Sequence, residues 1–181
     1  MKEIETKILE VDKNTIESVL SEKGAEHIGE TRLFVDWYQT PGTIEGQEAW
    51  YLRIRNSFDG GYELTWKGKH VEVAGSREVK EIHFHLPDHE KMRELLTVFG
   101  LEIYAHQEKD RSSWRLGDWR FDIDTYPGVP TFVEIEGTSG EHINEAAHML
   151  GVMDHERWND GERTLMEKRY GVDWKAMHFK Q

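Results

Sequence analysis

Side chains of like charge recur two residues apart along several short segments of this chain, with apolar residues between them. The acidic members of the pattern are Glu3, Glu5, Glu81, Asp122, Asp124, Glu134 and Glu136. The basic members are Lys7, Arg53, Arg55, Lys67, Lys69, Lys109 and Arg111. Carboxylate oxygens suit hard divalent cations, and clustered basic side chains hold phosphate oxygens. Together the two sets predict phosphoryl chemistry assisted by Mg²⁺ or Mn²⁺.

The spacing of these charges indicates where they point. Successive side chains of a β-strand alternate between its two faces, so residues two apart share a face. An antiparallel sheet with one wet face would account for any single strand. The pairs of like charges recur on several strands, and this is better explained if the charged faces of those strands point at one another. The sequence therefore predicts an α+β fold with a closed antiparallel β-barrel, a charged lumen and helices packed outside.

Three segments have the periodicity of amphipathic helices, and each lies between a helix-capping residue and a glycine. They are residues 13–23 between Asp12 and Gly24, the segment between Asp88 and Gly100, and the segment between Ser139 and Gly151. A fourth, weaker helix is expected within residues 162–170. The other segments alternate as strands joined by turns, among them residues 49–58, 62–69, 104–115, 119–125 and 131–137.

Length and composition narrow the class of protein. The chain has 181 residues, no cysteine and a net charge of −12. We expect one domain over residues 1–181, with no Cys-ligated metal and no thiol nucleophile. The acidic balance argues against broad nucleic-acid binding, and no apolar run is long enough to cross a bilayer. A soluble, cytoplasmic protein is expected, either a monomer or a homodimer.

The segment Glu3-Ile4-Glu5-Thr6-Lys7 resembles the ExExK motif of the CYTH superfamily, the triphosphate tunnel metalloenzymes. Further matches follow in the family's order: Asp36-x-Tyr38, Leu52-Arg53-Ile54-Arg55, Leu64-Thr65-Trp66-Lys67-Gly68, Lys80-Glu81-Ile82, Lys109-x-Arg111, Asp124 and Glu134-Ile135-Glu136. The resemblance spans about residues 1–137 by motif. It implies an eight-stranded closed antiparallel β-barrel that binds a small-molecule triphosphate and a divalent metal.

The resemblance also assigns roles. It implies that the metal ligands are Glu3, Glu5, Glu81, Asp124, Glu134 and Glu136. The phosphate-binding residues would be Lys7, Arg53, Arg55, Lys67, Lys109 and Arg111. Glu5 and Lys7 are the expected catalytic residues, with Glu5 orienting the attacking water. Lys69 and Asp122 match the family pattern less clearly. Family members often carry another basic residue near the C-terminus, for which Lys168 and Arg169 are candidates.

Three functions remain open at this point. The first is metal-dependent hydrolysis of an inorganic, organic or nucleoside triphosphate. The second is a class IV adenylyl cyclase that converts ATP to cyclic AMP and pyrophosphate. Those cyclases carry a His-Phe pair a few residues before ExExK, whereas here Glu3 stands two residues after Met1, so hydrolysis is favoured. The third is a non-catalytic nucleotide or polyphosphate binder, which would not need so many carboxylates.

Two other features have weaker functional interpretations. His83-x-His85 places two imidazoles on one strand face, and a solvated pair is favoured over a metal site. The polar loop 39–48 is either an ordinary hairpin loop, which is favoured, or a cover for the mouth of the barrel.

Overall fold

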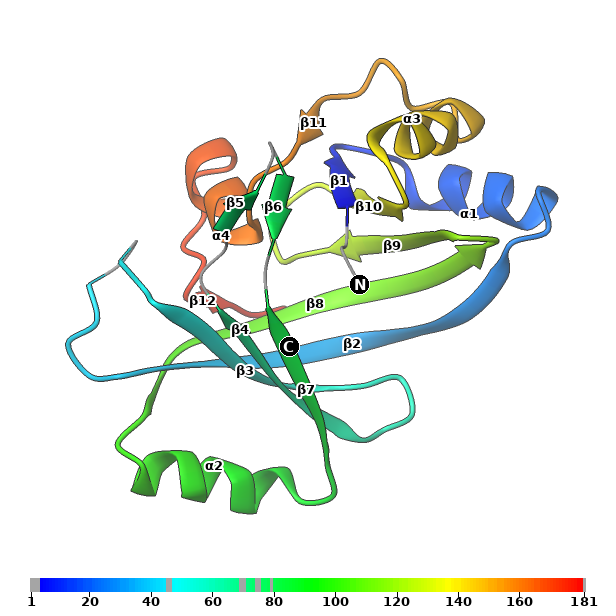
Figure 1. Ribbon diagram of the computed structural model, residues 1–181. Coiled ribbons are helices and arrows are strands. Elements are labelled where there is room, and N and C mark those ends of the chain that lie inside the picture. Colours follow the sequence, from blue (N-terminus) through cyan, green and yellow to red (C-terminus); the bar gives the residue numbers. More distant parts are fainter. Residues whose placement is uncertain (1–3, 45–46, 69–70, 74–75, 79, 181) are drawn as a thin grey trace.

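The computed structural model describes residues 4–44, 47–68, 71–73, 76–78 and 80–180 (Figure 1). Two members of the charged pattern, Glu3 and Lys69, lie outside the described residues. No helix in the described part of the chain is long and apolar enough to span a membrane.

A long antiparallel sheet forms the framework, in the order β1-β10-β9-β8-β2-β3-β4-β7. Its strands are β1 (Ile4–Ile8), β10 (Phe132–Gly137), β9 (Trp119–Thr125), β8 (Glu102–Leu116), β2 (Glu26–Gln39), β3 (Trp50–Asn56), β4 (Tyr62–Gly68) and β7 (Glu81–Leu86). The central pair, β2 and β8, is the longest and curves through the molecule (Figure 1). The predicted α+β class and antiparallel sheet are thus present, and the short strands β11 and β12, described below, bring the sheet to ten strands.

The predicted closure of the barrel is not observed among the described residues. The sheet ends at β7 on one side, and on the other side β11 (Arg157–Trp158) pairs with β1. Lys7 and Ile8 of β1 are partnered by β11, so β7 cannot take that edge there. A separate hairpin, β5 (Val71–Val73) with β6 (Ser76–Glu78), lies between β4 and β7 in the chain. The result is a deep, curved sheet with two edges.

Three capped helices cover the outer surface of the sheet. They are α1 (Lys13–Glu22), α2 (His89–Val98) and α3 (Gly140–Met149), capped by the side chains of Asp12, Asp88 and Ser139, which accept hydrogen bonds from backbone N–H groups. Gly24 and Gly100 follow the first two at φ of 77° and 79°, where a side chain would be strained. All three helices match the predicted segments.

The helices pack on the apolar faces of the strands. Ile16 and Leu20 of α1 and Ile143 of α3 join one buried cluster with Phe121 and Ile123 of β9. The two β9 side chains alternate with the charged Asp122 and Asp124. Burying them against the helices leaves the carboxylates on the opposite, inner face, as the alternation predicted. Helix α2 covers the outer face of β3 and β4 in the same way.

The C-terminal segment folds over the inner face of the sheet. It comprises α4 (Glu162–Thr164), a π-helical turn η1 (Leu165–Arg169) and the short strand β12 (Ala176–Met177), which runs parallel to β8. Leu165, Met166 and Trp174 are buried there against Leu33 and Val35 of β2. The weak helix predicted within 162–170 is therefore present as α4 and η1, and it forms part of the wall described next.

Candidate active site

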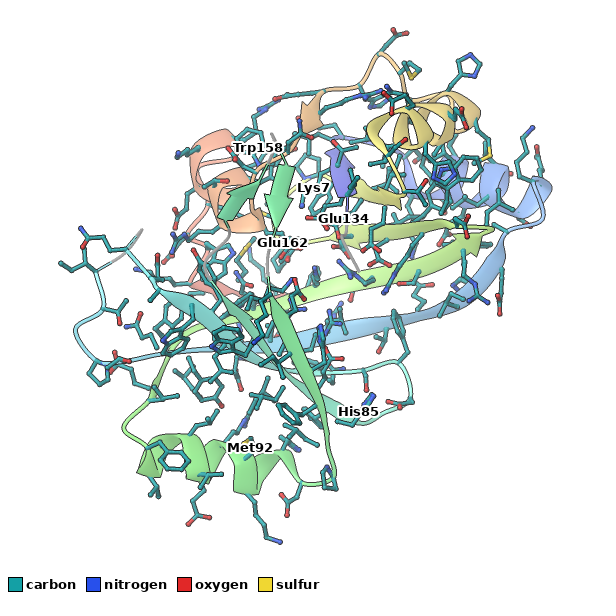
Figure 2. The ribbon with its side chains drawn as sticks, viewed as in Figure 1. Lys7, His85, Met92, Glu134, Trp158 and Glu162 are labelled. Carbon is teal, nitrogen blue, oxygen red and sulfur yellow. The ribbon has the colours of Figure 1, made fainter. Side chains whose placement is uncertain are left out.

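The charged inner face encloses a cavity of about 390 Å³ between two walls and the C-terminal segment. Its cationic lining residues are Lys7, Arg53, Arg55, Lys67, Lys109, Arg111, Arg120 and Arg163. Its acidic lining residues are Glu5, Glu81, Asp122, Glu134, Glu136, Asp160 and Glu162. Lys7, Glu134 and Glu162 gather near its centre, whereas His85 lies far off along β7 (Figure 2). The structure thus brings together ten of the twelve predicted site residues; Glu3 lies outside the described residues, and Asp124 is buried and is not among the residues that line the cavity.

One wall carries a cluster of carboxylates. Single oxygens of Glu5, Glu134 and Glu136 all lie within 4.8 Å of one another. The register of β1 and β10 produces this arrangement, because Glu5 pairs with Glu136 and Lys7 pairs with Glu134. Three converging carboxylates from two adjacent strands are a donor set for a hard divalent cation.

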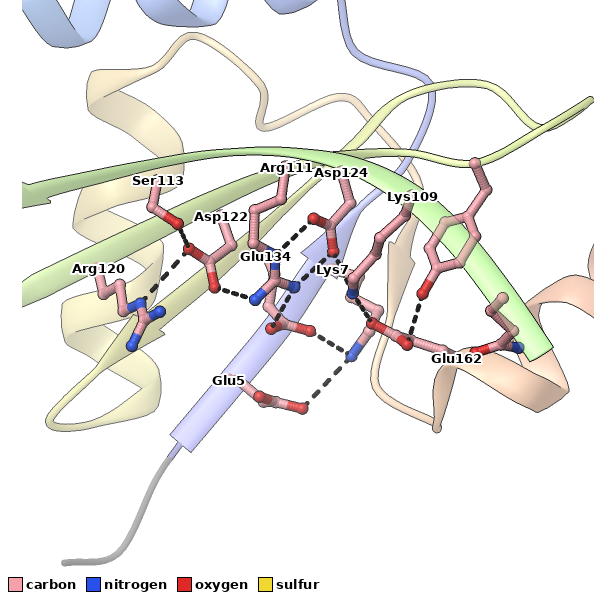
Figure 3. Close-up of polar contacts among 12 residues, drawn as sticks. Glu5, Lys7, Lys109, Arg111, Ser113, Arg120, Asp122, Asp124, Glu134 and Glu162 are labelled. Atoms are coloured by element: carbon pink, nitrogen blue, oxygen red, sulfur yellow. Dashed lines mark hydrogen bonds and ion pairs between the residues drawn. The ribbon is translucent and has the colours of Figure 1, made fainter. Parts of the chain in front are cut away.

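Lys7 holds this cluster together. Its Nζ lies 2.8 Å from Glu134 Oε2 and 3.3 Å from Glu5 Oε1 (Figure 3). Burial alone would lower the pKa of Lys7, but Glu134 and Glu5 more than offset it and raise that pKa. The Glu5 side chain is 44% exposed, yet the desolvation of its carboxylate and then Glu134 raise the pKa of Glu5, so its ionised form carries a net cost. A cation placed between the carboxylates would remove that cost.

Deeper in the same wall, buried charges form a ladder (Figure 3). Arg111 donates to both oxygens of Asp124, at 2.7 and 2.6 Å, and to Asp122 at 2.5 Å. Lys109 donates to Asp124 at 2.9 Å and to Glu162 at 2.8 Å. These residues are almost inaccessible, at 0% for Asp124, 2% for Lys109 and 6% for Arg111. The ladder satisfies each charge and fixes the floor of the cavity.

Asp124 does not reach the cavity in this arrangement. Both of its oxygens accept hydrogen bonds from Arg111, and Oδ2 also accepts one from Lys109. Because Arg111 pairs with Asp124 across β8 and β9, the register turns the carboxylate toward its neighbouring strand. These contacts orient Arg111 and Lys109, and the direct metal contact that the resemblance implied for Asp124 stays a prediction.

The opposite wall has an excess of positive charge. Arg53 and Arg55 of β3 line it. Arg55 Nη2 forms an ion pair with Glu63 Oε1 at 3.3 Å. Burial, followed by Arg53 and Arg111, lowers the pKa of Arg55 to about 10. Arg53 Nε is buried without a hydrogen-bond partner among the described residues. Guanidinium groups that crowd one another at a cavity wall form a site for a multiply charged anion.

Strands β4 and β7 complete this wall. Lys67 Nζ contacts Glu81 Oε1 at 2.7 Å, and His83 Nε2 lies 3.3 Å from Glu81 Oε2. Lys67 also acts on Glu5 from across the cavity, where it lowers the pKa of that carboxyl against the larger effect of burial. Glu81 lines the cavity, as predicted. Among the described residues it does not belong to the cluster of Glu5, Glu134 and Glu136.

Sequence reasoning missed the contribution of the C-terminal segment. Glu162 of α4 accepts hydrogen bonds from Lys109 at 2.8 Å and from Tyr126 Oη at 2.7 Å. Arg163 lines the cavity beside it, whereas Arg169 pairs with Glu10 and Glu156 on the exterior. The C-terminal basic residue at the cavity is therefore Arg163 rather than Lys168 or Arg169. The only available signal was the Gly161-Glu162 start of a weak helix.

We expect Glu162→Gln to lower the free energy of unfolding at pH 7 by about 1.5–3 kcal/mol, because it removes a charged hydrogen-bond acceptor. Burial would raise the pKa of Glu162, but Lys109 and Lys7 hold it well below its ordinary value of 4.5. The stabilisation is therefore present above pH 4.5 and is lost as the pH falls through the depressed pKa. Urea unfolding of both proteins at pH 7, 5 and 3.5 checks this. A difference in stability that grows on acidification would contradict it.

The polar loop 39–48 touches the mouth of the cavity. Glu48 Oε1 accepts from Arg163 Nη1 at 2.6 Å. Residues of this loop also line a smaller hollow of about 270 Å³ with Trp50 and Tyr104. The loop thus contacts a side chain that lines the site.

Comparison with known proteins shows a family match. The model of the CYTH domain family matches residues 1–148. A protein of Methanocaldococcus jannaschii named "Putative adenylate cyclase MJ0240" is 30% identical over 158 residues, which cover 84% of this chain and 86% of that protein.

Solved structures share the fold. A Vibrio parahaemolyticus "putative adenylate cyclase" superposes with a TM-score of 0.77 at 17% identity, over 92% of this chain and 98% of its own. A Hippeastrum "putative adenylyl cyclase" described as having a dominant triphosphatase activity has a TM-score of 0.64 at 15% identity, over 94% and 95% of the two chains. At these identities the likeness concerns the fold. With the family match over most of its length and the paired charges converging in one cavity, this chain belongs to the CYTH domain family.

Proposed function

We propose that this protein hydrolyses a small-molecule triphosphate in a metal-dependent reaction inside the charged cavity. The observation that carries the proposal is the separation of charge in the cavity, with carboxylates on one wall and guanidinium groups on the other. Three carboxylates converge on one wall, and Arg53 and Arg55 crowd one another on the facing wall. A polyanion bridged to a divalent cation would neutralise both walls at once, which neither ion would do alone.

The donors present fit the metal that the family implies. Glu5, Glu134 and Glu136 offer hard oxygen ligands from two adjacent strands, as Mg²⁺ and Mn²⁺ require. A bound ion of this kind supplies Lewis-acid stabilisation of the negative charge on the phosphoryl oxygens. Lys7 fixes Glu5 and Glu134 in place for it.

The chain's own residues would perform the remaining tasks. Arg53 and Arg55 grip phosphate oxygens, and Lys67 and Arg120 add positive charge to the lining of the cavity. Lys7, Lys109 and Arg111 also face the phosphate chain, although each already has a carboxylate partner. The Glu5 carboxylate accepts a hydrogen bond from a water molecule and so directs the oxygen of that water at the terminal phosphorus.

Adenylyl cyclase activity is the second candidate. Trp37, Tyr51 and Trp174 line the same cavity, and the ring centroids of Trp37 and Trp174 lie 5.2 Å apart. An aromatic wall beside a phosphate site suits the base or sugar of a nucleotide. In cyclisation the 3′-hydroxyl attacks the α-phosphorus and pyrophosphate leaves, so the triphosphate must be shifted along the cavity relative to hydrolysis.

A product assay separates the candidates. The purified protein is incubated with inorganic triphosphate, ATP or thiamine triphosphate, with Mg²⁺ or Mn²⁺ in turn. Orthophosphate release supports the proposal, and cyclic AMP with pyrophosphate supports the cyclase. Tight binding by calorimetry without turnover of any of the three would identify a non-catalytic binding protein and overturn the proposal.

We expect Arg53→Ala and Arg55→Ala each to weaken triphosphate binding by about 1.5–3 kcal/mol, or about 10- to 100-fold in Kd. The lowered pKa of Arg55 means that its charge is disfavoured in the folded state, so its removal should not lower the melting temperature of the empty protein. Calorimetric titration and thermal melting measure the two effects.

Arg115→Ala is the matched control, because Arg115 is an exposed arginine whose side chain is paired with Glu26 at 2.7 Å. It should bind triphosphate as wild type does. Unchanged affinity in both cavity variants would remove Arg53 and Arg55 from the binding site.

A further inference from the structure

A second cluster of metal-binding side chains lies on the other face of β8, away from the cavity. Ligand atoms of His106, Glu108 and His178 all lie within 4.8 Å of one another. His106 and Glu108 alternate along β8 with Gln107 and Lys109, whose side chains face inward. The cluster is therefore separated from the three-carboxylate group by the sheet itself.

His106 is held in a fixed orientation. Its Nδ1 lies 2.5 Å from Asp36 Oδ1, because the register of β2 and β8 pairs these two residues. Asp36 is itself buried, and its other oxygen pairs with Arg93 of α2. A carboxylate that binds one ring nitrogen fixes the tautomer and leaves the other nitrogen with its lone pair, as in carboxylate–histidine–metal sites. A histidine that is only solvated at the surface does not require such a buried carboxylate partner.

The other two members come together through the C-terminal segment. Strand β12 pairs Ala176 with His106 and Met177 with Gln107, so His178 follows beside Glu108. His178 Nδ1 lies 3.6 Å from Glu108 Oε1, and its ring stacks on that of His106 at 4.9 Å. The half-exposed side chain of His178 has room to adjust its torsions.

We propose that His106, Glu108 and His178 bind a divalent transition-metal ion of the Zn²⁺ class on this outer face. Two imidazoles and one carboxylate favour Zn²⁺ or Co²⁺, whereas Mg²⁺ prefers oxygen ligands alone. The ligand atoms lie within 4.8 Å of one another, and the half-exposed His178 ring must turn out of its stack on His106 for all three to bond one ion at about 2.0–2.2 Å.

Such an ion would fasten the C-terminal segment to β8. The segment is already attached there by the Phe179 N–H, which donates to Glu108 Oε2 at 3.0 Å, and by Arg32, which lies 4.0 Å over the Phe179 ring. The same segment carries Trp174 into the cavity on the opposite side. The outer site would thus stabilise one wall of the inner site without contacting its ligands.

The test uses Co²⁺ as a spectroscopic probe and Zn²⁺ in calorimetry, with the chelator-treated full chain in millimolar Mg²⁺ to occupy the carboxylate cavity. Wild type should bind one Co²⁺ with visible absorption bands, and Zn²⁺ should displace it. His106→Ala and His178→Ala should each weaken binding at least about 10-fold. Zn²⁺ should raise the melting temperature of wild type and leave that of His178→Ala unchanged.

His148→Ala, at an exposed position in the last turn of α3, is the control and should bind as wild type does. Asp36→Asn should weaken binding about 10- to 100-fold while the three ligands remain. Retention of the Co²⁺ bands in both His106→Ala and His178→Ala would overturn the proposal. Loss of the bands in Glu134→Gln with retention in His178→Ala would assign the ion to the cavity instead. Neither readout requires turnover, so both are independent of the proposed hydrolysis.

Discussion

Glu5→Gln is expected to lower metal-dependent turnover of the triphosphate by about 10²- to 10⁴-fold, while the metal-free protein melts at a higher temperature than wild type. Glu5 lies within 4.8 Å of Glu134 and Glu136, so the amide removes one of three converging carboxylates. The stability gain follows from the pKa of Glu5, which burial and then Glu134 raise. An acid whose folded-state pKa exceeds its unfolded value destabilises the fold once it ionises.

The opposite pattern is expected of a structural ion pair. If the 3.3 Å contact with Lys7 were the main role of Glu5, the variant would melt lower and turn over normally. Mn²⁺ affinity, measured by electron paramagnetic resonance, gives a third readout that does not require turnover and should fall in the variant. Glu26→Gln, which alters an exposed acid on β2, is the control and should leave all three unchanged. Retained turnover together with lost stability would contradict the assignment.

Asp124→Asn is expected to lower the free energy of unfolding by about 3–5 kcal/mol, because two buried cations lose their shared counter-charge. For a chain of this length the loss corresponds to about 6–20 °C in melting temperature. Asp124 is 0% exposed and accepts hydrogen bonds from both Arg111 and Lys109. Mn²⁺ affinity should change little, since the carboxylate does not reach the cavity. Urea unfolding and Mn²⁺ titration on the same preparation measure both.

Asp110→Asn provides the matched comparison on the neighbouring β8. Asp110 also pairs with an arginine, Arg32, at 2.7 Å, but its side chain is 36% exposed. An exposed pair contributes about 0–1 kcal/mol, so this variant should stay close to wild type. A large loss of Mn²⁺ affinity in Asp124→Asn without a loss of stability would return Asp124 to the metal ligands, as the family resemblance implied.

The sequence determined which side chains face inward. Alternation in β9 and β10 places Asp122 and Glu134 opposite Phe121 and Ile135, and the structure buries those apolar partners under α1 and α3. The helix bounds were also predictable, because Asp12, Asp88 and Ser139 cap them and a glycine follows each. These features depend on residues close together in the chain, so local patterns were sufficient to find them.

Only the tertiary structure decided how the inward-facing charges divide their roles. Asp124 and Glu134 have the same parity, yet cross-strand register gives Asp124 to Arg111 and Lys109, while Glu134 joins Glu5 and Glu136.

The local pattern also could not predict the contribution of Glu162 or the failure of β7 to close the sheet against β1. Both follow from the C-terminal segment folding back, with β11 pairing along β1 and α4 reaching Lys109. Alternation fixes the face that a side chain occupies. The ion-pair partner of a charged side chain on that face depends on strand register and on segments distant in sequence, because the energy of an ion pair depends on the distance between the charges in space.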